Sequence, residues 1–341
     1  MKANLIVEPS RPMLAETCEN WNLINFPVLA TPKLDGHRCL TLNPEKVGDG
    51  KSRCVSRSYK LHRNVFAREW IEEYCDPGLD GELVVLDKDG KLLPFNEISS
   101  ALSSGDGEPN FRFWIFDDFS KGLSEPYASR MRRLEKRKLP KFCERILPVL
   151  IHTVAELEKF EEKCLAEGHE GVMIRNVNGG YKQGRSTVAE GWLLKIKRFK
   201  SEEGTVVGWG ELFANNNPAT VSEVGLTKRS SHSANKVGKG VVGTVIVKPL
   251  SLGKPTKEDM KFLKDNAHRL GAAVNDHPYL FNCPISPITQ KGNYILMKDA
   301  PWLMGKLLTY RHQPSGKLVK PRFPVGHGWR DKRDMDAKGV K

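Results

Sequence analysis

The sequence predicts an α+β protein of two domains. Its 341 residues are more than one compact core usually organises, because single cores stop growing beyond about 250–300 residues. The first part alternates short β-like runs with amphipathic helical patterns, and the second part is mostly β-like runs separated by glycine turns. We place the boundary at the charged stretch 199–204, which gives domains over 1–199 and 200–341.

Three runs predict strands in the first domain. Residues 27–42 are two extended runs joined by a turn at Gly36, and residues 79–87 are another strand with a turn at its start. Residues 111–119 are rich in aromatic side chains, which is typical of a buried strand.

Amphipathic patterns predict three helices in the same domain, at 63–74, 126–138 and 153–167. The last helix begins at Thr153 and carries Glu156 three residues on, which is the signature of a capping box. Gly168 is a stop signal for it.

The second domain is expected to be a small barrel or sandwich, from β-like runs at 204–212, 241–250, 294–299 and 305–312. An insert at 213–240 is rich in asparagine, serine and lysine and has no apolar periodicity. A structureless segment of that length inside a compact domain is usually functional or disordered. We therefore expect the insert to be disordered or mobile in the free protein and to become ordered on a partner.

The charge balance indicates a polyanionic partner. Lysine and arginine number 54 against 41 acidic residues, a formal net charge of +13. No apolar run approaches the ~20 residues of a membrane span, and the first residues lack the apolar core of a signal peptide. We expect a cytoplasmic, nucleic-acid-facing protein with no membrane partner.

Cysteine and histidine usage gives no sign of a zinc site. The seven cysteines are odd in number and scattered, and no pair has Cys-x-x-Cys spacing. The histidines form no spaced metal cluster. We expect reduced thiols in or near the core, in a reducing compartment.

Lys33 to Arg38 reads Lys-Leu-Asp-Gly-His-Arg and resembles the Lys-x-Asp-Gly-x-Arg nucleophile motif of covalent nucleotidyl transferases. Further motifs follow in order: Ser56-Arg57, Asp80-Gly81-Glu82, Phe116-Asp117, the run 170–175, Lys195-Ile196-Lys197, Arg322-Phe323-Pro324 and Arg330-Asp331-Lys332. This ordered set resembles that of the DNA ligase and mRNA-capping superfamily, and it extends over nearly the whole chain.

Three segments narrow the resemblance to small viral and phage ATP-dependent DNA ligases of the Chlorella virus type: 181–187, 193–197 and 228–232. The likeness is weaker at 90–110 and 250–300. It implies an adenylation domain with nucleotidyltransferase fold, built from ATP-grasp-like antiparallel sheets with flanking helices, followed by an OB-fold β-barrel. It also implies that a monomer uses ATP to seal 3′-OH/5′-phosphate nicks in duplex DNA, through a lysine–AMP and an adenylated-DNA intermediate.

The residue types suit this chemistry. A lysine attacks phosphorus only as the neutral amine, whereas a free lysine has a pKa of about 10.4. Lys195 and Lys197 alternate along an expected strand, so both can lie beside Lys33, favour its neutral form and hold the α-phosphate. Asp35 and Glu170 offer the hard oxygen ligands that Mg²⁺ (or Mn²⁺) takes.

The resemblance implies the remaining roles. Arg38 and Glu82 would bind the ribose hydroxyls, Phe116 would stack on adenine, and Arg57 and Arg185 would bind phosphates through the guanidinium fork. Arg330 with Lys332 would reach the pyrophosphate, which requires a hinge near residue 200. The implied DNA contacts are Arg57, Arg185, Ser186, Thr187, Lys228, Arg229 and His232.

Other functions share part of this pattern. Capping guanylyltransferases and RNA ligases use the same lysine motif, but Arg322-Phe323-Pro324 favours a DNA ligase, and many RNA ligases lack the second β domain. Only 32 residues precede Lys33, which favours ATP over NAD as the adenylate donor. From a different class, a non-catalytic OB-fold protein that binds single strands stays open, although the intact lysine and carboxylate motifs argue against it.

Overall fold

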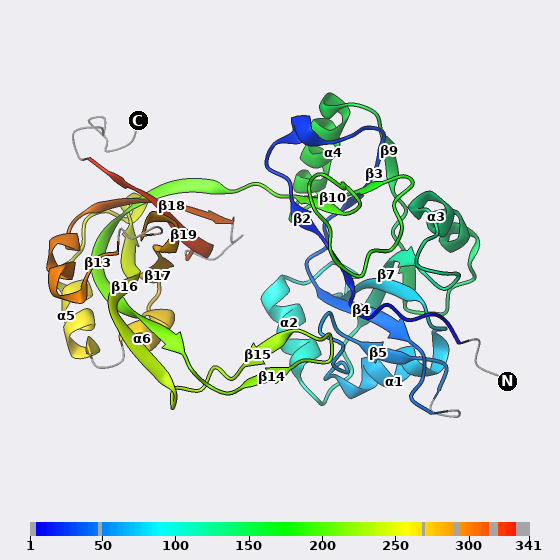
Figure 1. Ribbon diagram of the computed structural model, residues 1–341, viewed down its shortest axis with the longest axis horizontal. Coiled ribbons are helices and arrows are strands. Elements are labelled where there is room, and N and C mark those ends of the chain that lie inside the picture. The colour runs from blue at the N-terminus through cyan, green and yellow to red at the C-terminus, as the bar shows by residue number, and fades with distance from the viewer. Residues whose placement is uncertain (1–4, 47–49, 268–269, 290–293, 314–319, 332–341) are drawn as a thin grey trace. The chain divides into compact units, whose positions relative to one another are not determined.

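The computed structural model describes residues 5–46, 50–267, 270–289, 294–313 and 320–331 (Figure 1). The chain divides into two units, Met1–Lys197 with Val221–Lys228, and Arg198–Thr220 with Arg229–Lys341. Among the described helices, none has the length and apolar character needed to cross a membrane.

Unit 1 contains two five-stranded sheets. The first has the order β2 (Glu16–Thr17), β12 (Leu194–Ile196), β10 (Val172–Asn176), β3 (Val28–Pro32) and β9 (Val149–Ile151). All its neighbours are antiparallel except β2 and β12. Helix α4 (Val154–Ala166) buries Leu157 and Cys164 in the core of this sheet, against strand residues such as Val28 and Ile174.

The second sheet of unit 1 has the order β5 (Arg53–Val55), β4 (His37–Leu42), β6 (Leu79–Val85), β7 (Phe111–Asp118) and β8 (Cys143–Arg145). Its main core takes side chains from α1 (Val65–Tyr74), α2 (Phe95–Ser103) and α3 (Tyr127–Lys136). Unit 1 also contains a short parallel pair, β1 (Met13–Leu14) and β11 (Gly184–Arg185), and the 3-10 turn η1 (Trp21–Leu23).

The strands and helices that the sequence predicts for unit 1 are present, with two corrections. Residues 27–42 split into β3 and β4, residues 111–119 form β7, and the three helices lie where the patterns place them. The turn expected at Asp80-Gly81 was wrong, since both residues lie inside β6, where a Cβ on Gly81 would come 2.3 Å from the carbonyl oxygen of Trp114. This glycine therefore serves a close strand approach rather than a turn.

The second correction concerns the capping box. Thr153 caps α4 by accepting from the Glu156 N–H at 3.2 Å. The Glu156 carboxylate accepts from the N–H of His152 at 2.8 Å instead of from Thr153, so only half of the box forms.

Unit 2 contains an antiparallel five-stranded sheet with the order β17 (Phe281–Pro284), β16 (Lys236–Pro249), β13 (Lys200–Asn215), β18 (Leu307–Gln313) and β19 (Arg322–Arg330). Val245, Cys283, Leu308 and Tyr310 are among the residues of its main core. The other described elements are η2 (Leu250–Leu252), α5 (Lys257–Asp265), α6 (Leu270–Asp276), α7 (Ser286–Thr289) and η4 (Met297–Leu303).

The strand expected at 294–299 was wrong. Residues Met297–Leu303 form the 3-10 helix η4, and only Leu296 makes a bridge, to Val241. Pro301, two residues past the expected strand, lies inside η4.

The expectation that the insert at 213–240 is structureless was also wrong. β13 continues to Asn215 and pairs with the start of β16, and two further strands, β14 (Ala219–Val221) and β15 (Thr227–Arg229), pair with each other. Asn217 is 4% exposed, and its Nδ2 donates to the carbonyl oxygens of Ser230 and His232. Backbone pairing and a buried amide thus order a segment that has no apolar pattern.

Candidate active site

Lys33 begins the turn that connects β3 to β4. Its N–H donates to the carbonyl oxygen of Gly171 at 2.8 Å, and the N–H of Glu170 donates to the carbonyl oxygen of Lys33 at 3.3 Å. Its ammonium group forms a short ion pair with the Glu170 carboxylate, and the two side chains are 20% and 15% exposed. The expected nucleophile therefore lies beside one of the two expected metal ligands.

Gly171 allows this arrangement. A Cβ at this position would lie 2.2 Å from the carbonyl oxygen of Ile196, so only glycine lets the start of β10 and the end of β12 come so close. The end of β12 brings in Lys197, whose Nζ lies 4.0 Å from Oε1 of Glu170. The ends of three strands, β3, β10 and β12, thus place Lys33, Glu170 and Lys197 together.

Lys195 lies in β12, opposite Met173 of β10, and is partly buried. Burial and then the positive charges of Lys197 and Arg185 lower the pKa of Lys195, with Lys33 contributing as well. Lys197 directly follows the strand instead of lying within it. The expected cationic cluster is present, and its effect on Lys33 stays a prediction.

Arg38 lies in β4 and pairs across the sheet with Glu82 of β6. Its guanidinium binds both oxygens of the fully buried Asp80, with Nη2 donating to Oδ2 at 2.6 Å. The Tyr181 hydroxyl donates to the same Oδ2 at 2.7 Å. Asp80 and Tyr181 therefore fix the position of Arg38.

Burial raises the pKa of Glu82 to about 7, although the charges of Arg38 and Lys33 act in the opposite direction. Asp35 is partly exposed in the same turn as Lys33. The next residue, Gly36, packs tightly on β6, because a Cβ there would lie 2.3 Å from the carbonyl oxygen of Leu83. This contact holds the turn against the sheet that carries Glu82.

Phe116 lies in β7 and is partly exposed. The guanidinium carbons of Arg38 and Arg175 lie 4.8 and 5.8 Å from the centre of its ring. Arg175 is held in turn by Asp117, whose Oδ2 accepts from Nη1 at 2.7 Å. The ring expected to stack on a base therefore lies among the residues that surround Arg38.

The expected DNA-contacting residues of unit 1 are mostly exposed. Arg57, Arg185, Thr187 and Lys228 all face solvent. Ser186 is an exception that corrects the prediction: it is fully buried, and its hydroxyl accepts from the N–H of Leu193 at 3.2 Å. Its side chain therefore organises the backbone and is not offered to a ligand.

Within unit 2, Arg229 and His232 are exposed, and the Arg229 guanidinium donates to the carbonyl oxygen of Asn217. Arg330 ends β19, with its Nε 3.5 Å from Oε1 of Glu203. Lys332 lies outside the described residues.

Several residues of the site had no role in the sequence interpretation. Asp80 and Arg175 lie within recognised motifs, and a charged residue inside an apolar strand is a usable signal for a buried ion pair. Tyr181 begins the segment 181–187 that carries the resemblance, whereas Arg130 lies outside every recognised motif. Arg130 lies on α3 and is completely buried, with its Nε donating to Oδ1 of Asp117 at 2.7 Å.

The chain is similar to known DNA ligases. The family model of the ATP dependent DNA ligase domain matches residues 12–197. A DNA ligase of Methanothrix thermoacetophila is 32% identical over 146 residues, which cover 39% of this chain and 26% of that protein. The chain thus spans about a quarter of the length of this curated relative.

Solved structures of DNA ligases are also similar to this chain. A Lig E DNA ligase has a TM-score of 0.62 at 19% identity, over 95% of this chain and 100% of that chain, which shows a shared fold. The Chlorella virus DNA ligase-adenylate is 26% identical with a TM-score of 0.47, over 95% of this chain and 99% of that chain. With the family model matching more than half of its residues, this chain belongs to the ATP-dependent DNA ligase family.

Proposed function

We propose that this chain is an ATP-dependent DNA ligase that seals 3′-OH/5′-phosphate nicks in duplex DNA, with Lys33 as the residue that carries AMP. The observation that supports this most is the convergence of Lys33, Glu170 and Lys197 from three strand ends, with Lys195 beside them. Nucleotidyl transfer needs a lysine nucleophile, a carboxylate and cations for the phosphates, and all of these meet here.

The ion pair with Glu170 holds Lys33 in place but also stabilises its charged form. Before Lys33 can attack, its ammonium must lose a proton. Contact of the Glu170 carboxylate with another group would weaken this ion pair and free the Lys33 side chain. Lys195 and Lys197 would hold the α-phosphate as negative charge builds on it.

The donor set fits Mg²⁺ (or Mn²⁺), because Asp35 and Glu170 supply hard carboxylate oxygens at partly exposed positions. Bound there, the ion would neutralise phosphate charge. For the nucleotide we propose Phe116 on the adenine, with Arg38 and Glu82 at the ribose. Asp80 and Tyr181 support this assignment because they fix the guanidinium of Arg38 beside the ring.

We propose residues 1–199 as the adenylation domain and 200–341 as an OB-fold domain. The antiparallel five-stranded sheet of unit 2 is consistent with that assignment. Arg330, and Lys332 with it, are proposed to act on the pyrophosphate leaving group. The proposed phosphate ligands are Arg57 and Arg185, whose guanidinium groups can bind two phosphate oxygens at once.

The insert at 213–240 is proposed as a DNA clasp. Its basic side chains Lys228, Arg229, Lys236 and Lys239 are exposed, together with His232. Strand pairing gives the clasp a defined shape before DNA binds. In unit 1, Thr187 completes the proposed contacts, whereas the buried Ser186 would act only by supporting the backbone.

Incubation with labelled ATP and then with nicked DNA tests the proposal. We expect AMP on Lys33 by mass spectrometry and joining of the DNA strand. Labelling by GTP would indicate a capping guanylyltransferase, and joining of RNA but not DNA would indicate an RNA ligase. A protein that acquires no label and only binds nucleic acid would be the OB-fold binding module, and the proposal would be wrong.

A further inference from the structure

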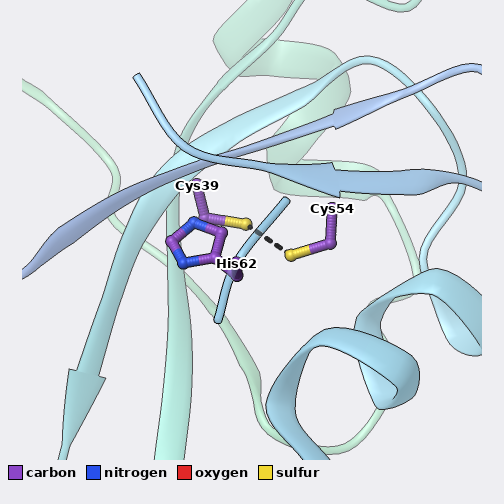
Figure 2. A group of neighbouring side chains, drawn as sticks. All are labelled: Cys39, Cys54 and His62. Carbon is purple, nitrogen blue, oxygen red and sulfur yellow. Dashed lines mark hydrogen bonds between the residues drawn. The ribbon is translucent and has the colours of Figure 1, made fainter. Parts of the chain in front are cut away.

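A second cluster of metal-ligating side chains lies in the second sheet of unit 1 (Figure 2). Cys39 of β4, Cys54 of β5 and His62 approach one another, with candidate ligand atoms all within 4.8 Å. The two sulfur atoms are 3.5 Å apart. The three residues are 0%, 0% and 5% exposed, so the cluster is enclosed.

Backbone pairing sets this geometry in advance. In the β4–β5 register Thr41 lies opposite Cys54, which makes Cys39 and Cys54 diagonal neighbours on one face. After β5 the chain turns back through a bridge between Val55 and Leu61, and the N–H of His62 donates to the carbonyl oxygen of Cys54 at 3.2 Å. The sequence spacing of these three residues matches no zinc-binding motif, and the pairing of β4 with β5 and the following bridge bring them together.

The distances suit a tetrahedral ion. With Zn–S of about 2.3 Å and Zn–N of about 2.0–2.1 Å, ligand atoms lie roughly 3.6–3.8 Å apart. The sulfur pair is within a few tenths of an ångström of that spacing, and the ring nitrogen must approach the sulfur atoms by up to about 1.2 Å. Side-chain rotation alone covers such differences.

A hydrogen bond to the backbone of β4 holds the His62 ring in place. Its Nε2 lies 3.0 Å from the carbonyl oxygen of Arg38, which accepts the ring N–H and leaves the other nitrogen with a lone pair. A neutral imidazole is the form that binds a metal.

Charge also favours a divalent ion here. When Zn²⁺ binds, both thiols release their protons to solvent, and the ion, two thiolates and an imidazole sum to zero charge. A neutral assembly is what an apolar interior tolerates. A monovalent soft ion with the same ligands would leave a buried negative charge.

We propose that Cys39, Cys54 and His62 bind one Zn²⁺, separate from the carboxylates assigned to Mg²⁺. The three residues fill three of the four positions of a tetrahedral ion. The site tethers β4 to β5 directly behind Arg38, whose carbonyl orients His62. Zinc would therefore stabilise the strand that positions Arg38.

Cobalt titration of the full chain tests the site. The protein is purified under reducing conditions, stripped with a chelator and titrated with Co²⁺ in excess Mg²⁺. We expect one equivalent to give a thiolate-to-cobalt charge-transfer band and the d–d bands of a tetrahedral site, both removed by Zn²⁺. Carboxylate sites give no thiolate band, so the magnesium site cannot produce this result.

Variants locate the ligands. Cys54→Ser should abolish the charge-transfer band, whereas Cys164→Ser, which changes a buried cysteine in a different core cluster of unit 1, should retain it. Should Cys54→Ser fail to fold, native mass spectrometry of His62→Gln replaces it, and bound zinc should fall at least tenfold at limiting metal.

Three outcomes would overturn the proposal. The first is the absence of a thiolate band in the wild type. The second is an undiminished band in Cys54→Ser together with retention of zinc by His62→Gln. The third is a disulfide between Cys39 and Cys54 that persists under reducing conditions.

Discussion

Arg130 gives the sharpest test of the packing behind the active site. Its guanidinium is completely buried and donates to Asp117 Oδ1 at 2.7 Å, to Oδ2 at 3.2 Å and to the carbonyl oxygen of Gly179 at 3.1 Å. Asp117 is equally buried and also binds Arg175. This network lies next to Phe116, so its loss would affect both stability and nucleotide binding.

We predict that Arg130→Met lowers the free energy of unfolding of unit 1 by about 3–5 kcal/mol, the range for removing one partner of a buried ion pair. Methionine fills most of the volume of the arginine stem but donates no hydrogen bond. Asp117 would then keep its ion pair with Arg175 but lose the one with Arg130, and the carbonyl oxygen of Gly179 would lose a donor. The loss would be smaller had the pair been exposed, since exposed pairs contribute about 0–1 kcal/mol.

The assay is hydrogen exchange by mass spectrometry on peptides from β7 and α3, which reports on unit 1 alone. Arg132→Met is the matched control, because Arg132 lies on the same helix but is exposed, and we expect a change within about 0.5 kcal/mol. Burial raises the pKa of Asp117, but Arg130 and Arg175 lower it more, so its net pKa is depressed. The pair therefore contributes at neutral pH and is lost as pH falls through that depressed value. A loss below about 1 kcal/mol at neutral pH would refute the reasoning.

Four further predictions follow from the site and the insert. Lys33→Ala should block formation of the AMP adduct yet retain some joining of preadenylated nicks, and an adduct on the variant in a mass spectrum would contradict the assignment. Arg330→Ala should slow the ATP-dependent step far more than joining of preadenylated DNA, whereas equal loss in both assays would point to misfolding. Replacing the exposed Lys228, Lys236 and Lys239 by alanine should make the slope of log K against log salt shallower by up to about 2.7, at about 0.9 per phosphate contact. An unchanged slope would reject the clasp, and three exposed lysines of α5 (Lys257, Lys261 and Lys264) serve as the control. Because the pKa of Glu82 is raised to about 7, its ionisation opposes folding as pH rises, and Glu82→Gln should raise the melting temperature at pH 8 but not at pH 4. An equal change in melting temperature at both pH values would show that ionisation of Glu82 does not destabilise the folded protein.

The sequence by itself determined the family and most of the elements of unit 1. Local patterns are sufficient for this where one face of an element is buried, as in α4 and β7, because hydrophobic periodicity then records the buried face directly. The ordered motifs identified Lys33, Glu170 and Lys195 without any knowledge of their distances, since their chemistry restricts the residue types.

Only the tertiary structure decided which residues meet. The pairing of Lys33 with Glu170 depends on Gly171 allowing β10 and β12 to approach, and Arg38 is held by Asp80 and Tyr181, which are distant in sequence. The order within the insert comes from backbone pairing and the buried Asn217 amide, neither of which leaves an apolar period. Likewise Cys39, Cys54 and His62 follow no metal-binding spacing, and strand register alone brings them together. Sequence patterns record burial along one element, whereas contacts between elements depend on register and close approach, which no single segment encodes.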